Sequence, residues 1–245
     1  MSHSAEIGIV AAMQMEIRSL VSSWNRETIS RNGRSFTFSR HDNVVATCCG
    51  PTAVNAAASA NLLVETYAPE MLISVGFSGA LVSHCRVPDI IVPGQVIDSA
   101  TGKSFNTVCG TDVLVTTNKV AGTMDKAQLA SRWSAVAVDM EAAAVAEIAQ
   151  ARGCQFAAVK AISDDAITEM DFVGRFVEPS GFRTGAFLAY IAPRPRLWSA
   201  VRQLRINSER ASSNLSSTLA TILSSPEGVI GALAAFAREH AVSIA

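Results

Sequence analysis

Apolar residues occur in two spacings along this chain, and the two spacings alternate. Short apolar runs of strand length are followed by longer segments of helical character, an arrangement typical of α/β proteins. A glycine-proline pair ends the second run, and Gly76 and Gly79 are expected to break the third. Strands are predicted at residues 7–12, 44–49, 71–75, 90–92 and 113–116, and helices at residues 14–21 and 53–67.

The most regular unit lies in the middle of the chain. Residues 135–138 are predicted as a strand, residues 141–152 as a helix that Gly153 ends, and residues 156–162 as a second strand. A strand, a helix and a strand of these lengths predict a right-handed parallel crossover. Acidic residues then stand where strands end and helices begin, the edge at which open α/β sheets bind ligands.

The last third of the chain changes in character. Residues 171–210 contain seven arginines against three acidic residues. Leu197, Val201 and Leu204 recur at helical spacing, and a final helix is predicted from near Pro226 to about residue 239. The chain shows no linker that would divide it. We therefore expect one domain, residues 1–245, with residues 171–245 as its helical C-terminal extension.

The fold expected from this pattern is a single-domain, three-layer α/β fold. A central twisted mixed, mostly parallel sheet would be flanked by helices, with the C-terminal helices added outside it. Hydrophobic residues make up 49% of the chain and charged residues only 17%, which is sufficient for a large core.

Charge and cysteine content exclude several classes of function. With 20 basic and 21 acidic residues, the chain does not have the basic excess of a nucleic-acid-binding protein. Five cysteines without paired spacings do not form a disulfide framework, and the four histidines lie too far apart to predict a metal site. No basic region leads into an apolar stretch at the start, and no apolar run spans a bilayer, so the expected location is the cytoplasm.

Three acidic residues are candidates for chemistry: Glu16, Glu141 and Asp164. Each also has an ordinary structural interpretation. Glu16 and Glu141 would lie in the first turns of helices, where the helix dipole favours carboxylates, and Asp164 could cap a helix. Taken singly, the ordinary interpretation is the stronger one for each residue.

Taken together, four ordered motifs resemble the superfamily of purine nucleoside phosphorylases and methylthioadenosine/adenosylhomocysteine nucleosidases. The motifs are IGIVAAMQME at residues 7–16, VGFSGA at 75–80, VDMEAAA at 138–144 and AISD at 161–164. The resemblance covers about residues 6 to 165, and the four motifs in this order are specific where any one alone is not.

The resemblance implies an enzyme that cleaves the N-glycosidic bond of a purine nucleoside, with adenine the expected base. Asp164 would protonate the purine at N7, and Glu16 would orient or deprotonate an attacking water. Glu141 and Met140 would hold the ribose hydroxyls. The expected substrate-binding set is completed by Phe77, Ser78, Gly79, Val120, Ala121 and Ser163. No metal or organic cofactor is implied.

This assignment makes chemical sense. Cleavage of the bond leaves negative charge on the departing base, and a carboxylic acid near the base neutralises it, with about a 10²–10⁴-fold effect on rate. Asp164 would then have to carry a proton in a dry pocket. Glu141 would stabilise the cationic sugar.

Two departures from the family pattern bear on the reaction. Where the phosphorylases place a phosphate-binding arginine, this chain has Ser74, which favours water over phosphate as the nucleophile. Inorganic phosphate stays open as a co-substrate, because an arginine from the tail or a neighbouring subunit could substitute. Between Asp98 and Gly110 the chain has only a short loop where the nucleosidases carry a helix, so a bulky 5′ substituent could project outwards.

The short middle segment and the arginine-rich tail are similar to the hopanoid-associated phosphorylase branch, whose proposed substrate is adenosylhopane. A lipid-linked substrate would give the tail a role in peripheral membrane contact, through Leu197, Trp198, Val201, Leu204 and the arginines beside them. The ordinary interpretation, a surface helix packed on the domain, is the stronger one.

Other interpretations remain to be weighed. The resemblance implies a homo-oligomer and a small-molecule nucleoside as the ligand. A non-catalytic nucleoside-binding protein of the same fold is the alternative, against which the three carboxylates count. A dinucleotide-binding oxidoreductase is discarded because GxGxxG is absent.

Overall fold

The computed structural model describes residues 6–178 and 181–240. The strands in these residues form one large twisted sheet and one small hairpin. The strands are β1 (Ile7–Ala11), β2 (Asn25–Arg31), β3 (Arg34–His41), β4 (Val44–Cys48), β5 (Met71–Ala80), β6 (Ile90–Ile91), β7 (Gln95–Asp98), β8 (Ser104–Asn106), β9 (Val113–Thr116), β10 (Ala137–Asp139), β11 (Gln155–Asp164), β12 (Val177–Glu178) and β13 (Gly181–Phe182).

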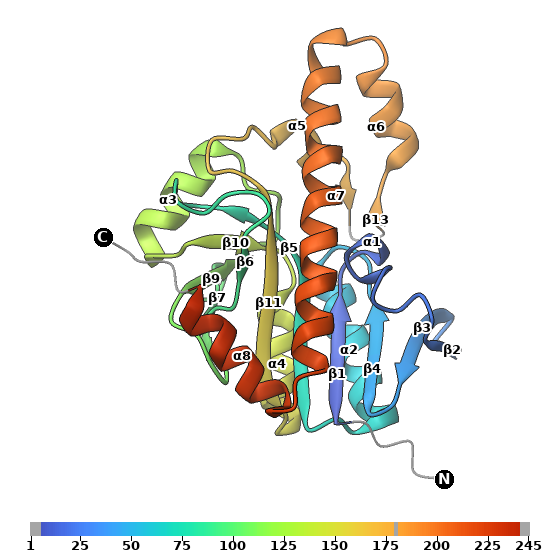
Figure 1. Ribbon diagram of the computed structural model, residues 1–245. Helices are drawn as coiled ribbons and strands as arrows, with labels where there is room; N and C mark the ends of the chain where they lie inside the picture. Colours follow the sequence, from blue (N-terminus) through green and yellow to red (C-terminus); the bar gives the residue numbers. More distant parts are fainter. Residues whose placement is uncertain (1–5, 179–180, 241–245) are drawn as a thin grey trace.

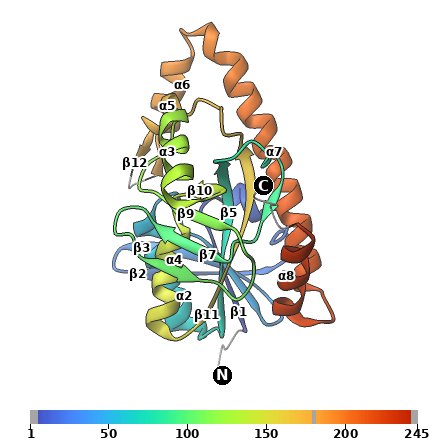
Figure 2. The ribbon, with the colours of Figure 1, turned by 90° about the vertical axis from the view of Figure 1, so that its left-hand side faces the viewer.

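Helices cover both faces of the large sheet, so that the molecule has three layers (Figure 1). The helices are α1 (Gln14–Ile17), α2 (Ala53–Tyr67), α3 (Thr123–Trp133), α4 (Ala142–Arg152), α5 (Asp171–Gly174), α6 (Thr184–Ile191), α7 (Pro195–Leu223) and α8 (Gly228–Glu239). Helices α2 and α4 lie on one face, and α7 with α8 lies on the other, as the turned view shows (Figure 2). The expected three-layer α/β fold is confirmed.

Strand β5 organises the large sheet. It pairs in parallel with β1 on one side and with β11 on the other, and its last residues pair antiparallel with β10. The strand order is β2-β3-β4-β1-β5-β10-β9-β7-β8, with β11 lying between β5 and β6. The sheet is therefore mixed, as expected.

The expected parallel crossover through α4 is wrong. Strands β10 and β11, which α4 connects, both pair with β5, but β10 is antiparallel to it and β11 is parallel. Strand β5 has ten residues, enough to hold β11 along its length and β10 at its end. The handedness rule concerns parallel strands of one crossover, and these two strands do not form one.

The expected break of the third strand at its glycines is also wrong. Strand β5 continues through Gly76 and Gly79, and Gly76 keeps its place opposite Lys160 of β11. The glycines leave room for side chains of the site. A Cβ at Gly76 would lie 3.0 Å from Glu16 Oε1, and a Cβ at Gly79 would lie 2.9 Å from Asp164 Oδ2.

Two further differences are local. The first helix ends at Ile17 and not at residue 21. Strands β2 and β3 form a hairpin that the sequence analysis did not predict, although Asn32-Gly33 at its turn is a strong hairpin signal. Both turn residues have the positive φ, 51° and 73°, that such a turn requires.

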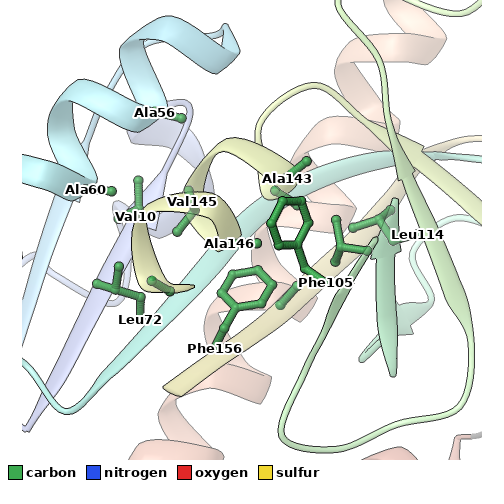
Figure 3. Close-up of a cluster of buried hydrophobic side chains, with 14 of the residues drawn as sticks. Val10, Ala56, Ala60, Leu72, Phe105, Leu114, Ala143, Val145, Ala146 and Phe156 are labelled. Carbon is green, nitrogen blue, oxygen red and sulfur yellow. The ribbon is translucent and has the colours of Figure 1, made fainter. Parts of the chain in front are cut away.

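Small side chains let the helices of one face pack closely on the sheet (Figure 3). Ala56 and Ala60 of α2 and Ala146 of α4 are almost completely buried. They pack with Val10 of β1 and Leu72 of β5 in one cluster. The alanine-rich segments of the sequence therefore form helices whose buried faces are nearly flat.

The opposite face is covered by the second half of α7. Ala211, Leu215, Leu219 and Ile222 are buried there at helical spacing, against β1, β5 and β11. The first half of α7 extends beyond the sheet and pairs with α6 (Figure 1). Leu188 and Trp198 on this projection are 59% and 55% exposed, and membrane contact stays a prediction. Among the described residues, no helix is long and apolar enough to cross a membrane.

We propose that residues 171–245 belong to the same cooperative unit as the sheet, as far as the structure describes them. Leu219→Ala is therefore expected to lower the free energy of unfolding by about 2–5 kcal/mol, since the side chain it truncates is fully buried against the sheet. In chemical denaturation, Leu219→Ala should show a single unfolding transition, at a lower denaturant concentration than the wild type. Leu188→Ala, at an exposed site, is the control and should change little. A separate early transition for the helices would contradict the proposal.

Candidate active site

A cavity of about 330 Å³ lies at the ends of β1, β5, β9, β10 and β11. Parallel sheets commonly place their ligand sites at this edge. All ten residues that the sequence analysis named line this one cavity. They are Glu16, Phe77, Ser78, Gly79, Val120, Ala121, Met140, Glu141, Ser163 and Asp164. The structure brings the residues together, and their individual roles stay predictions.

Glu16 belongs to α1 and to the cavity wall at the same time. Its Oε2 accepts a hydrogen bond from the Met13 N–H at 2.8 Å, which closes the first turn of α1, and its Oε1 accepts one from the Phe77 N–H at 3.1 Å. The side chain is 1% exposed. Burial raises the pKa of Glu16 to about 7, against the opposing effect of these hydrogen bonds and of the Lys160 ammonium.

Glu141 does not have the capping role that its position at the start of α4 suggests. It is the N-cap residue, but its side chain makes no capping hydrogen bond. Asp139 takes that role, because its Oδ2 accepts a hydrogen bond from the Ala142 N–H at 2.9 Å. Glu141 lines the cavity instead, and burial, together with the negative charge of Asp139, raises its pKa to about 8.

A buried lysine that the sequence analysis missed lies beneath these carboxylates. Lys160 Nζ is 2.9 Å from Asp139 Oδ2 and donates to Ser74 Oγ at 3.0 Å. Burial alone would lower the pKa of Lys160, but the nearby carboxylates of Asp139, Glu141 and Glu16 outweigh it and raise that pKa. The signal in the sequence was a single lysine within the otherwise apolar run of β11.

A cation, the ammonium of Lys160, therefore lies next to Ser74. The sequence has no arginine at this position, and no arginine is among the described residues that line the cavity. Lys160 nevertheless places an ammonium on the Ser74 hydroxyl. Because it is also paired with Asp139 and lies near two further carboxylates, its charge is already balanced by the protein.

Asp164 is held by hydrogen bonds at both carboxylate oxygens. Its Oδ1 accepts one from Ser163 Oγ at 2.9 Å, and its Oδ2 accepts one from Lys126 Nζ at 2.5 Å. The role expected of Asp164, to protonate the purine at N7, stays a prediction. Lys126 was not identified from the sequence.

Both polar and apolar side chains line the cavity. The Ser78 hydroxyl is buried and has no hydrogen-bond partner in the described part of the chain. The N-cap and body of α5, the β12–β13 hairpin and α7 supply apolar side chains, namely Met170, Val173, Val177, Phe182 and Leu204. Among the described residues, no cluster of side chains could hold a metal ion.

The chain matches a model of the phosphorylase superfamily over residues 6–112 and 100–189. A 5′-methylthioadenosine/S-adenosylhomocysteine nucleosidase of Maridesulfovibrio salexigens is 35% identical over 95 residues, which are 37% of this chain and 41% of that protein. The nucleosidase of the same name from a Marinomonas species is 29% identical over 199 residues, covering 64% of this chain and 85% of the relative. The match thus spans about two fifths of the first relative and most of the second.

The fold is also that of solved structures. The structure of the Helicobacter pylori 5′-methylthioadenosine/S-adenosylhomocysteine nucleosidase superimposes with a TM-score of 0.63 at 18% identity, covering 88% of this chain and 98% of that chain. At this identity the likeness concerns the fold alone.

The raised pKa of Glu16 predicts a pH dependence of stability. Between the ordinary value of 4.5 and about 7 only the folded state keeps the proton, so this group makes the wild type less stable as the pH rises through that range. Glu16→Gln has no titratable group at this position, so its stability does not fall for this reason as the pH rises. The free energy of unfolding of the variant minus that of the wild type should therefore rise by on the order of 3 kcal/mol between pH 4.5 and pH 7.5.

Urea denaturation at a series of pH values measures this difference. Glu209→Gln, which changes an exposed carboxylate on α7, is the matched control and should show no comparable trend. A difference between Glu16→Gln and the wild type that stays constant with pH would contradict the raised pKa.

Proposed function

The chain belongs to the phosphorylase superfamily, and on this premise we propose that it cleaves the N-glycosidic bond of a purine nucleoside, with adenine as the departing base. The observation that carries the proposal is the meeting of Glu16, Glu141 and Asp164 on one cavity, although they lie far apart in the sequence. Relatives named as nucleosidases support it.

The ribose would lie between Glu141 and Ser78. A carboxylate can accept hydrogen bonds from two hydroxyls, and it stabilises the positive charge that the sugar gains as the bond breaks. The unpartnered hydroxyl of Ser78 would gain a hydrogen-bond partner from the sugar. Met140, beside Glu141, would contact the sugar ring.

The nucleophile we propose is water, activated by Glu16. With a pKa of about 7, this carboxyl is partly deprotonated at neutral pH, as a general base should be. A phosphate dianion would meet Glu16 and Glu141, and among the residues that the structure describes no arginine lines the cavity. The balanced charge of Lys160 offers it little compensation.

The 5′ substituent would contact the apolar side chains that α5, the β12–β13 hairpin and α7 supply to the cavity. Met170, Val173, Val177, Phe182 and Leu204 offer it no charged partner. We propose that this substituent is bulky and apolar, as in the adenosylhopane of the hopanoid-associated branch. Burial of an apolar group there would stabilise the complex by about 25 cal/mol per Å² of surface removed from water.

The reaction is tested by chromatography of the base released from adenosine, 5′-methylthioadenosine and inosine, with and without inorganic phosphate. Release of adenine independent of phosphate is the expected result. Strict dependence on phosphate, with ribose 1-phosphate as product, would make phosphate the nucleophile. Binding of nucleosides without release of base, including nucleosides with apolar 5′ groups, would favour the non-catalytic alternative.

Asp164→Asn should reduce turnover of the preferred nucleoside by about 10²–10⁴-fold, because it removes the carboxylate that we assign to the departing base. Nucleoside affinity, measured by calorimetry, should change little, since the amide has nearly the same shape. Asp165→Asn is the matched control: this neighbouring side chain accepts a hydrogen bond from the Val87 N–H and does not line the cavity. A fully active Asp164→Asn enzyme would remove Asp164 from the mechanism.

Leu204→Ala should raise KM by about tenfold for nucleosides with a long alkyl group at the 5′ position, since a truncated leucine contact is worth about 1–2 kcal/mol. KM for adenosine itself should stay nearly constant. Leu197→Ala on the same helix is the control, because Leu197 does not line this cavity. Equal effects on both kinds of substrate would place the 5′ group elsewhere.

A further inference from the structure

Lys126 is an unusual residue for its position. Helix α3 lies at the surface, and Lys126 is its one buried residue, with 1% of the residue exposed. A buried ammonium costs several kcal/mol of desolvation unless it is well paired. A surface helix that turns a lysine inwards, while keeping its other side chains at least partly exposed, suggests a specific task for that lysine.

The ammonium of Lys126 pairs with Asp164, and both residues line the cavity. Nζ donates to Asp164 Oδ2 at 2.5 Å and to the backbone carbonyl of Asp165 at 2.7 Å. An ammonium has three N–H bonds, and the third has no acceptor in the part of the chain that the structure describes. Because Lys126 also lines the cavity, this third N–H is available to a ligand.

The sheet makes room for this pair. A Cβ at Gly79 of β5 would lie 2.9 Å from Asp164 Oδ2 and 3.3 Å from Lys126 Cε. Any larger residue there would press on both partners. The pairing of Asp164 with Lys126 at this place therefore requires a glycine at position 79.

Both carboxylate oxygens of Asp164 are already engaged within the protein. Each of its oxygens already accepts a hydrogen bond, one of them from an ammonium. The N–H bond of this pair that is left for a ligand therefore belongs to Lys126.

We propose that Lys126 supplies the proton that the departing purine takes up, and that Asp164 holds the ammonium in place and binds the exocyclic amine of the base. This assignment rests on the proposed function. The edge of adenine beside N7 presents one acceptor, N7, and one donor, the N6 amine. An ammonium donor beside a carboxylate acceptor is complementary to that edge.

Protons and electrons balance along this route. The C1′–N9 bond breaks and its electron pair stays with the base, while N7 takes one proton from the Lys126 ammonium and leaves a neutral amine. Water adds its oxygen to C1′ and gives one proton to Glu16. After the products leave, Glu16 releases its proton and Lys126 regains one from solvent.

Two substrates separate proton donation from positioning. One is 5′-methylthioadenosine, whose base needs a proton to depart. The other is the 4-nitrophenyl β-D-ribofuranoside with the same 5′-methylthio group, because 4-nitrophenolate departs without a proton. Lys126→Met removes the ammonium. Lys126→Arg keeps a positive charge that cannot be deprotonated in a protein. Lys103→Met, at an exposed lysine paired with Glu147, is the control.

For both Lys126 variants we expect kcat for adenine release to fall at least about 100-fold, with nitrophenolate release within about threefold of wild type. Full adenine release by Lys126→Arg would show that positive charge suffices and would overturn the assignment. Equal losses on both substrates would overturn it too, because Lys126 would then only support the site. A wild-type enzyme inactive on every nucleoside would instead overturn the proposed function and this assignment with it.

Discussion

Two buried ammonium groups balance the charge of the carboxylates around one cavity, and the site depends on that balance. Lys160 pairs with Asp139 and lies close enough to Glu16 and Glu141 to oppose the rise in their pKa values. Lys126 pairs with Asp164. A buried carboxylate ion without such a partner costs several kcal/mol. With the two lysines, the site holds two carboxyl groups, Glu16 and Glu141, that gain or lose a proton close to neutral pH.

Strand β5 provides the geometry that this balance requires. It is the parallel neighbour of both β1 and β11, so Glu16 after β1 and Asp164 at the end of β11 come to opposite sides of it. Its two glycines let both carboxylates approach the backbone more closely than any side chain would permit. The capping bond from Asp139 to α4 leaves the neighbouring carboxylate of Glu141 free to face the cavity. The strand at the centre of the core therefore also sets the positions of Glu16 and Asp164 relative to each other.

The lining of the cavity combines two kinds of side chain. The sheet, α1 and the N-cap of α4 supply the carboxylates of Glu16, Asp139, Glu141 and Asp164, and α5, the β12–β13 hairpin and α7 supply apolar side chains. Lys126 belongs to none of these elements, since it is supplied by a surface helix. If it donates the proton, the acid in this chain is a pair of residues in which one partner binds and the other reacts.

Local pattern in the sequence determined most of the elements, because apolar periodicity, glycine stops and prolines act over a few residues: residues 53–67 form the expected helix, and the acids follow the strands as expected. The ordered motifs contain eight of the ten residues predicted for the site, and all ten are among those that line the cavity. Tertiary structure alone decided the order and direction of β10 and β11, since β5 offered two different edges to strands distant in sequence. It alone decided the pairing of Lys126 with Asp164, 38 positions apart, and of Lys160 with Ser74, 86 positions apart. A lysine in a surface helix and a lysine in a strand give no sign of their partners until the sheet register brings the carboxylates to them.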